Sequence, residues 1–142
     1  MIYMGNAQTY IDGDSTLATL AAADIVSINT AGNAVKVAAN ASTTAVGVVY
    51  SGVSSSTVGK QVSYVVSGKT KVYAAVATDG TAIEVGTPLI IGEGSTRGAG
   101  QVLVAAASGA DATTIVGKAL EAVALNTTTA QETLIDVEVN FQ

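Results

Sequence analysis

The 142-residue chain contains no histidine, no cysteine and no tryptophan, and it has a single proline. Without histidine it lacks the side chain that titrates near neutral pH, and without cysteine it lacks the thiolate nucleophile. These two residue types are also the commonest ligands of zinc and other transition metals. We therefore expect no enzyme, no catalytic residues, no metal site and no cofactor. The sequence favours a structural or binding role.

Charge is scarce as well, because charged residues make up 12% of the chain and the net charge is −5. The basic residues are scattered over Lys36, Lys60, Lys69, Lys71, Arg97 and Lys118. A protein that binds nucleic acid or an anionic membrane usually gathers its basic residues into a patch or stripe. We therefore expect neither a nucleic-acid partner nor a membrane partner.

Long apolar runs and targeting signals are missing too. The first residues have no basic region followed by an apolar stretch, so we expect no signal peptide. The longest apolar runs, such as residues 45–50, are far shorter than the roughly 20 residues that span a bilayer. The length suits one domain, since single domains commonly have about 100–200 residues.

What the chain does have is 49% hydrophobic residues arranged in alternation with polar ones. The clearest example is the C-terminal segment, where the apolar positions are Ile135, Val137, Val139 and Phe141. The intervening positions are Asp136, Glu138 and Asn140. A period of two residues is typical of a half-buried strand, here with an acidic outer face.

Residues 60–77 contain two β-rich runs on either side of Ser67-Gly68, and we expect a hairpin. A three-residue loop, 66–68, would place Gly68 where positive φ is needed and would pair Tyr64 with Thr70. One face would then carry Val62, Tyr64, Val72, Ala74 and Val76. The other face would carry Gln61, Ser63, Lys69, Lys71 and Tyr73.

Further strands are expected throughout the chain. A second hairpin joins residues 24–29 to 34–38, and other strands are expected at 45–50, 82–85, 89–91, 101–105 and 115–123. Residues 17–23 are alanine-rich and favour a helical turn. Many short strands separated by Ser, Thr, Gly and Asn predict an all-β, antiparallel sandwich or barrel-like single domain. We divide the chain into an N-terminal arm, 1–14, and an all-β domain, 15–142.

Three glycine- or aspartate-containing segments come close to known ligand-binding motifs. Residues 52–60 have six residues between the glycines of a phosphate-binding loop, which needs four. Residues 92–100 miss the dinucleotide-binding spacing by one, and a strand follows instead of a helix. Asp12-Gly13-Asp14 lacks the later ligands of a calcium loop. We expect loops at all three, with 92–100 a mobile surface loop whose Arg97 contacts a partner.

The aromatic and apolar residues outside the strands predict a contact surface. The first sixteen residues include Ile2, Tyr3, Met4, Tyr10 and Ile11, more apolar residues than a solvated tail usually has. We expect this arm to dock on a neighbouring subunit or partner. Tyr73 shares the face of Lys69 and Lys71, where its ring is either exposed or an interface anchor. With Arg97 and Phe141, these residues form the predicted interface with a partner or another subunit.

The strand segments also resemble a family of small β-rich capsid decoration (head-stabilising, or cement) proteins of tailed bacteriophages. The resembling segments are DIVSI at 24–28, AVGVV at 45–49, GKQVSYVVSG at 59–68, VGTPL at 85–89, IVGKALEA at 115–122 and IDVEV at 135–139. The resemblance implies a homotrimer on the outer surface of the virion that binds the major capsid protein and bridges neighbouring capsomers.

Other functions remain open from the sequence. One is a carbohydrate- or receptor-binding β module on a virion or cell surface, which usually shows clustered exposed aromatic residues. Another is an accessory domain of a phage tail or major capsid protein. A small serine hydrolase is the least favoured, since the hydroxyl residues follow the strands and loops.

Overall fold

The structure is a computed structural model that describes residues 6–12, 20–30, 32, 34–38, 44–51 and 60–141. The strands are β1 (Asn6–Asp12), β2 (Ile25–Ile28), β3 (Ala34–Lys36), β4 (Ala45–Ser51), β5 (Lys60–Val76), β6 (Pro88–Gly92), β7 (Val102–Ala105), β8 (Gly117–Ala119) and β9 (Gln131–Asn140). A single 3-10 turn, η1 (Ala112–Thr114), is the one helical element in these residues. None of the described helical structure is long and apolar enough to cross a membrane.

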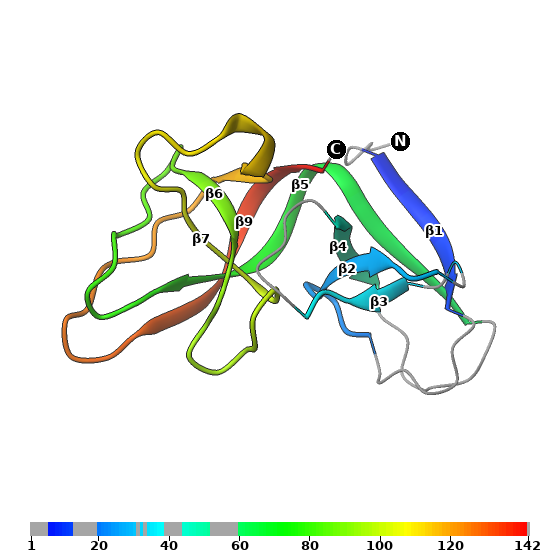
Figure 1. Cartoon of the computed structure of the whole chain (residues 1–142), viewed down its shortest axis with the longest axis horizontal. Coiled ribbons are helices and arrows are strands. Elements are labelled where there is room, and N and C mark those ends of the chain that lie inside the picture. Colours follow the sequence, from blue (N-terminus) through cyan, green and yellow to red (C-terminus); the bar gives the residue numbers. More distant parts are fainter. Residues whose placement is uncertain are drawn as a thin grey trace.

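The strands form two units that share β5 (Figure 1). The second half of β5 joins β7, β6, β8 and β9 in a closed five-stranded ring, which we call the barrel. The first half joins β4, β2 and β3 on one side and β1 on the other, and we call these strands the side sheet. The predicted all-β, barrel-like architecture is confirmed. Neighbouring strands are antiparallel except β5 and β7, which are parallel where Ala74 lies opposite Leu103.

The expected hairpin at residues 60–77 is wrong, because β5 runs unbroken through 66–68. Ser67 and Gly68 lie opposite Asn140 and Val139 of β9. On the β1 side the register skips Val66, and Gly68 has a φ of 113°. The glycine signal thus marks a bulge and a bend within one strand. The second half of β5 pairs with β9, which is distant in the sequence, and not with the first half of β5 as a hairpin would require.

The residues predicted to face inward are nevertheless buried, although they do not share one face. The positions Val62, Tyr64, Val72, Ala74 and Val76 are all buried, whereas Lys69 and Lys71 are exposed. The two halves of β5 serve different cores, however. Val62 and Tyr64 pack in the side sheet, but Val72 packs in the barrel core together with Val65. The bulge at 66–68 shifts the alternation by one residue and so turns the strand from one core to the other.

Two hydrophobic cores stabilise the fold. The larger fills the barrel and reaches one face of the side sheet; its fully buried members include Ile25, Val48, Leu89, Leu103 and Val137. The smaller consists of Leu20, Val26, Ala34, Val49, Val62 and Tyr64. In β2, Ile25 belongs to the larger core and the next residue, Val26, belongs to the smaller one. Both faces of the side sheet are therefore buried.

Most of the other predicted strands are present. The second hairpin is confirmed as β2 and β3, with Gly32 at a φ of 86° in the connection. The segments at 45–50, 89–91 and 101–105 are strands β4, β6 and β7. Residues 82–85 make only the single bridge of Ile83 to Val123, and 115–123 is strand only in β8. Of the helical turn expected at 17–23, the described part, 20–23, is an irregular turn with Ala23 at a φ of 74°.

The N-terminal segment adds a strand to the side sheet of its own chain. β1 pairs antiparallel with β5 from Asn6 to Asp12, which lies opposite Lys60. It also approaches β3, the far end of the same sheet, so the sheet is strongly curled. The predicted boundary at residue 14 falls within 13–19, outside the described residues.

Candidate binding surface

The structure separates the predicted interface residues. Ile2, Tyr3 and Met4 lie outside the described residues. The backbone of Tyr10 lies opposite Val62, one residue along β1 from Ile11. Phe141 is 6% exposed within the barrel core, and its N–H donates to the carbonyl of Val66 at 2.9 Å. Phe141 is therefore a core residue of this chain and is not part of its surface.

Tyr73 and Arg97, in contrast, are brought together. The guanidinium carbon of Arg97 lies 4.1 Å from the centroid of the Tyr73 ring, which is within the range of a cation–π interaction. Tyr73 comes from β5 and Arg97 from the loop between β6 and β7. The contact fixes the position of the Tyr73 ring, which is partly exposed.

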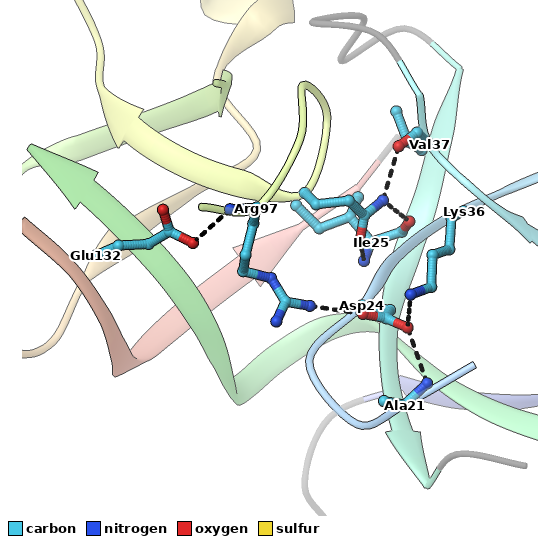
Figure 2. Close-up of polar contacts among 8 residues, drawn as sticks. Ala21, Asp24, Ile25, Lys36, Val37, Arg97 and Glu132 are labelled. Atoms are coloured by element: carbon cyan, nitrogen blue, oxygen red, sulfur yellow. Dashed lines mark hydrogen bonds and ion pairs between the residues drawn. The ribbon is translucent and has the colours of Figure 1, made fainter. Parts of the chain in front are cut away.

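Arg97 is itself held by a buried carboxylate (Figure 2). Its Nη2 donates to Oδ1 of Asp24 at 2.7 Å, and the Asp24 side chain is fully buried. The other oxygen of Asp24 accepts from the N–H of Ala21 at 2.8 Å and lies 3.1 Å from Nζ of Lys36. A buried carboxylate is costly unless it is paired and hydrogen-bonded, and Asp24 has two cations and an amide.

The loop that carries Arg97 is anchored at a second point. The N–H of Arg97 donates to the carboxylate of Glu132 at 2.9 Å (Figure 2). The N–H of Thr96 donates to the same carboxylate at 2.9 Å, and the hydroxyl of Ser95 lies 3.5 Å from it. The expected surface loop is present, and these hydrogen bonds connect it to β9. Glu132 lies near the start of β9, far from the loop in the sequence, so the local sequence does not indicate this contact.

Gln101 joins the barrel to the side sheet next to the same loop. Its side-chain oxygen accepts from the N–H of Ile25 at 3.0 Å. Its side-chain nitrogen donates at 2.8 Å to the carbonyls of Ile25 and Val37. Gln101 is buried, so these three bonds satisfy backbone groups that have little access to water.

A groove of about 450 Å³ lies beside Tyr73, where the two units meet, and we call it the tyrosine groove. It is lined by Ala22, Ala23, Val49, Tyr50, Lys69, Thr70, Lys71, Tyr73, Leu134 and Asp136. Tyr50 is 53% exposed and Leu134 is 40% exposed, and both are large apolar side chains. The groove therefore combines an apolar and aromatic lining with a few charged groups, as small-ligand sites commonly do.

The charged groups of the groove form a small network. Asp136 lies 3.0 Å from the ammonium groups of both Lys69 and Lys71, and Lys71 also lies 3.9 Å from Glu121. Hydrogen bonds from Lys69 and Lys71 hold the pKa of Asp136 below its ordinary value of 3.8. The hydrogen bond to Asp136 and the nearby carboxylates raise the pKa of Lys71 above 10.5. Both shifts favour the charged forms of Asp136 and Lys71.

Other exposed apolar side chains lie on the barrel. Val85 is 69% exposed and Leu125 is 41% exposed. In the ranges that the structure describes, no three acidic side chains come close enough together to hold a metal ion.

No protein-family model matches the chain, and no curated protein matches it either.

Sequence reasoning missed the partners that make this surface. Leu134 falls on the outer face of β9, in alternation with Asp136 and Glu138, so an apolar residue at a polar position was the available signal. Tyr50, which ends the apolar run of β4, was not missed: with Tyr73 it is one of the two aromatic residues that the sequence offers as exposed, and it is 53% exposed. Nothing in the local sequence of Asp24 pointed to Arg97, because the pair is formed only by the tertiary fold.

Proposed function

We propose that this chain is a non-enzymatic capsid decoration protein that binds the outer surface of a viral head as a homotrimer. Its partners would be the major capsid protein and further copies of itself. The support is the resemblance of its strand segments to that family, together with an all-β fold of the kind the resemblance implies. Bridging neighbouring capsomers would stabilise the shell.

The observation that carries this proposal is the position of β1 in the side sheet. β1 has one ladder in the described part of the chain, to β5, and it belongs to the apolar N-terminal segment. A strand at the edge of a sheet presents N–H and C=O groups that pair readily with another chain. The N-terminal segment is therefore suited to contact the capsid or an adjacent trimer.

The exposed apolar side chains give further support. Val85 and Leu125, both outside the tyrosine groove, are 69% and 41% exposed and come from different parts of the chain. Contacts that bridge subunits depend on buried area, shape and apolar side chains, and they need no titrating group. Because many copies bind one shell, the small stabilisation from each copy sums to a large stabilisation of the particle.

The experiment that tests the proposal is to image purified particles with and without this protein, and to measure the mass of the free protein. We expect density at three-fold or quasi-three-fold positions of the head exterior, and a trimer in sedimentation. Particles without the protein should disrupt at lower temperature. A strict monomer at high concentration that does not bind heads would contradict the proposal.

Truncation of the N-terminal segment tests the role of β1. Removing residues 1–5 leaves β1 whole, whereas removing 1–10 takes away most of it and exposes an edge of β5. We expect both truncations to weaken capsid binding, and the second also to lower stability. Circular dichroism of each truncated protein separates lost binding from lost folding. Full capsid binding by a folded 1–10 truncation would refute the assignment of the arm.

A further inference from the structure

The tyrosine groove has a lining that is fixed before any ligand arrives. Tyr73 packs under Arg97, and Arg97 is held by the buried carboxylate of Asp24. Lys69 and Lys71 are positioned by their ion pairs with Asp136. Binding to groups that are already ordered costs less conformational entropy than binding to groups that must be immobilised.

The chemistry of the lining suits a sugar. Two tyrosines, Tyr50 and Tyr73, offer aromatic surface that ends in a polar hydroxyl, and Leu134 adds apolar surface beside them. A sugar ring has the matching pattern, since its C–H groups form an apolar face and its hydroxyls form a polar rim. Asp136 accepts hydrogen bonds and the two lysines donate them. A sugar hydroxyl, which can donate and accept, therefore has a partner for either role.

The charge of the groove indicates an acidic ligand. The groups that line it, Lys69, Lys71 and Asp136, have a net charge of +1 on a chain of net charge −5, and Glu121, which is not part of the lining, lies 3.9 Å from Lys71. The side chains of the two lysines are 61% and 56% exposed, so their ammonium groups reach solvent. Complementary charge favours a partner that carries carboxylates.

The strand pairing argues against an extended peptide as the occupant. Peptides that bind β proteins commonly add a strand to a free sheet edge. β4 pairs with β2 and β5, the lining residues of β9 pair with β5, and the carbonyl of Asp136 accepts from the N–H of Leu120. Recognition in the groove therefore rests on side chains, and rigid sugar rings fit such a surface better than a backbone does.

We propose that the tyrosine groove binds an acidic oligosaccharide whose rings carry carboxylates, such as a chain of uronic acids. Tyr50 and Leu134 pack against the ring, Lys69 and Lys71 pair with its carboxylate, and Asp136 accepts from its hydroxyls. This activity is separate from capsid decoration, and it would give a decorated particle weak, many-fold attachment to an acidic polysaccharide.

The first experiment is a titration of the full chain, followed by NMR, with tetragalacturonate as the acidic saccharide and maltotetraose as the neutral one. We expect saturable shifts at the groove residues, and binding of tetragalacturonate at least about tenfold tighter than maltotetraose. A peptide of four glutamates should not saturate. Equal binding of that peptide, or no saturation with tetragalacturonate, would overturn the proposal.

Matched variants test whether the groove is the site. Lys71 and Lys118 are equally exposed and each is paired with carboxylates, so Lys71→Gln and Lys118→Gln form one pair. Leu134 and Leu125 are 40% and 41% exposed, so Leu134→Ala and Leu125→Ala form another. We expect tetragalacturonate binding to weaken about fivefold or more for the groove variants and less than about twofold for the controls.

A third variant, Tyr50→Ala, removes the most exposed ring of the groove and should weaken tetragalacturonate binding about tenfold with an unchanged melting temperature. Equal losses in groove and control variants would show general charge attraction and overturn the proposal. A lower oligomeric mass for Tyr50→Ala would show that a second copy of the chain covers the groove, and this outcome also overturns it. Capsid binding is measured in parallel, so that failure of either proposal is recognised separately.

Discussion

Nη2 of Arg97 lies 2.7 Å from Oδ1 of Asp24, and this ion pair ties the β6–β7 loop of the barrel to the residue that precedes β2 in the side sheet. Asp24 is fully buried, whereas the Arg97 side chain is 25% exposed. Removing one partner of a buried pair leaves a charge without compensation, which costs much more than the pair contributes in water. The two units are therefore joined by an interaction that is sensitive to single substitutions.

We predict that Arg97→Ala lowers the free energy of unfolding by about 3 kcal/mol, because the buried carboxylate of Asp24 loses its closest cation. Lys36→Ala should cost only about 1 kcal/mol, since Lys36 is 42% exposed and water compensates part of its loss. Urea denaturation at neutral pH measures both. An Arg97→Ala protein as stable as Lys36→Ala would show that the pair contributes little.

Gln101 provides a second test of the joint between the units. In Gln101→Glu the side chain retains an acceptor but loses the N–H groups that donate to the carbonyls of Ile25 and Val37. We expect a loss of about 2–4 kcal/mol at pH 7, the scale for a buried group facing unsatisfied partners. The introduced carboxyl is also buried, so it should have a raised pKa and be partly rescued by protonation.

The pH dependence distinguishes this account of Gln101 from simple misfolding. Because the pKa of the introduced carboxyl would be higher in the folded than in the unfolded state, its protonated form stabilises the fold at low pH. This stability is lost as the pH rises through the folded pKa. The difference in unfolding free energy between the natural chain and Gln101→Glu should therefore shrink from pH 7 to pH 4.5. A constant difference would contradict the assigned hydrogen bonds.

Gly68 should tolerate substitution poorly. It lies at a φ of 113° in the bulge of β5, where a side chain strains the backbone. We predict that Gly68→Ala lowers the free energy of unfolding by about 1–3 kcal/mol. Gly98→Ala is the control, because a Cβ at Gly98 meets nothing within 4 Å, and it should be neutral within about 0.5 kcal/mol. Similar losses at both positions in thermal melts would argue against the bulge.

The lysine–aspartate network of the groove predicts acid sensitivity. The pKa of Asp136 is held below 3.8 by hydrogen bonds from Lys69 and Lys71. A depressed folded pKa contributes stability that is fully present above the ordinary value and is lost as the pH falls through the folded one. We therefore expect the stability advantage of the natural chain over Asp136→Asn to be constant from pH 5 to 7 and to decline below about pH 4.

Asp79→Asn, which removes an exposed carboxylate from a turn, is the control for net charge. Urea titrations between pH 2.5 and 7 measure both variants. If Asp136→Asn and Asp79→Asn lose their differences from the natural chain in parallel, general charge rather than the lysine pairs governs the acid response. At the alkaline end, the raised pKa of Lys71 predicts that the contribution of Lys71 is retained until the pH exceeds about 10.5.

The sequence predicts what depends on local pattern. Alternation places Val62, Tyr64 and Val72 in the interior and Lys69 and Lys71 outside, and composition predicts an all-β barrel-like fold. Alternation is a local property, because each strand must bury one face whichever strand lies beside it. Alternation does not identify the neighbouring strand. The Ser67-Gly68 pair therefore predicts a turn at a position where the strand in fact bends and continues alongside β9.

The candidate surface is predictable only in part, for the same reason. Residue type singles out Tyr73 and Arg97, but their contact with each other depends on the path of the chain between them. Phe141 is aromatic and near the end of the chain, and these two properties wrongly assign it to the interface. Its alternation with Val139 in β9 is the better guide, since both lie in the barrel core.

The shared strand has a consequence for how the molecule loses its structure. β5 is the central element of the barrel and of the side sheet, and Figure 1 shows it passing from one to the other. Neither unit can release β5 without exposing the core of the other. The slowest-exchanging amides should therefore extend along both halves of β5, from Val62 to Val76, with one common opening free energy. The two units then unfold as one cooperative body, and a substitution that destabilises either unit lowers the stability of the whole protein.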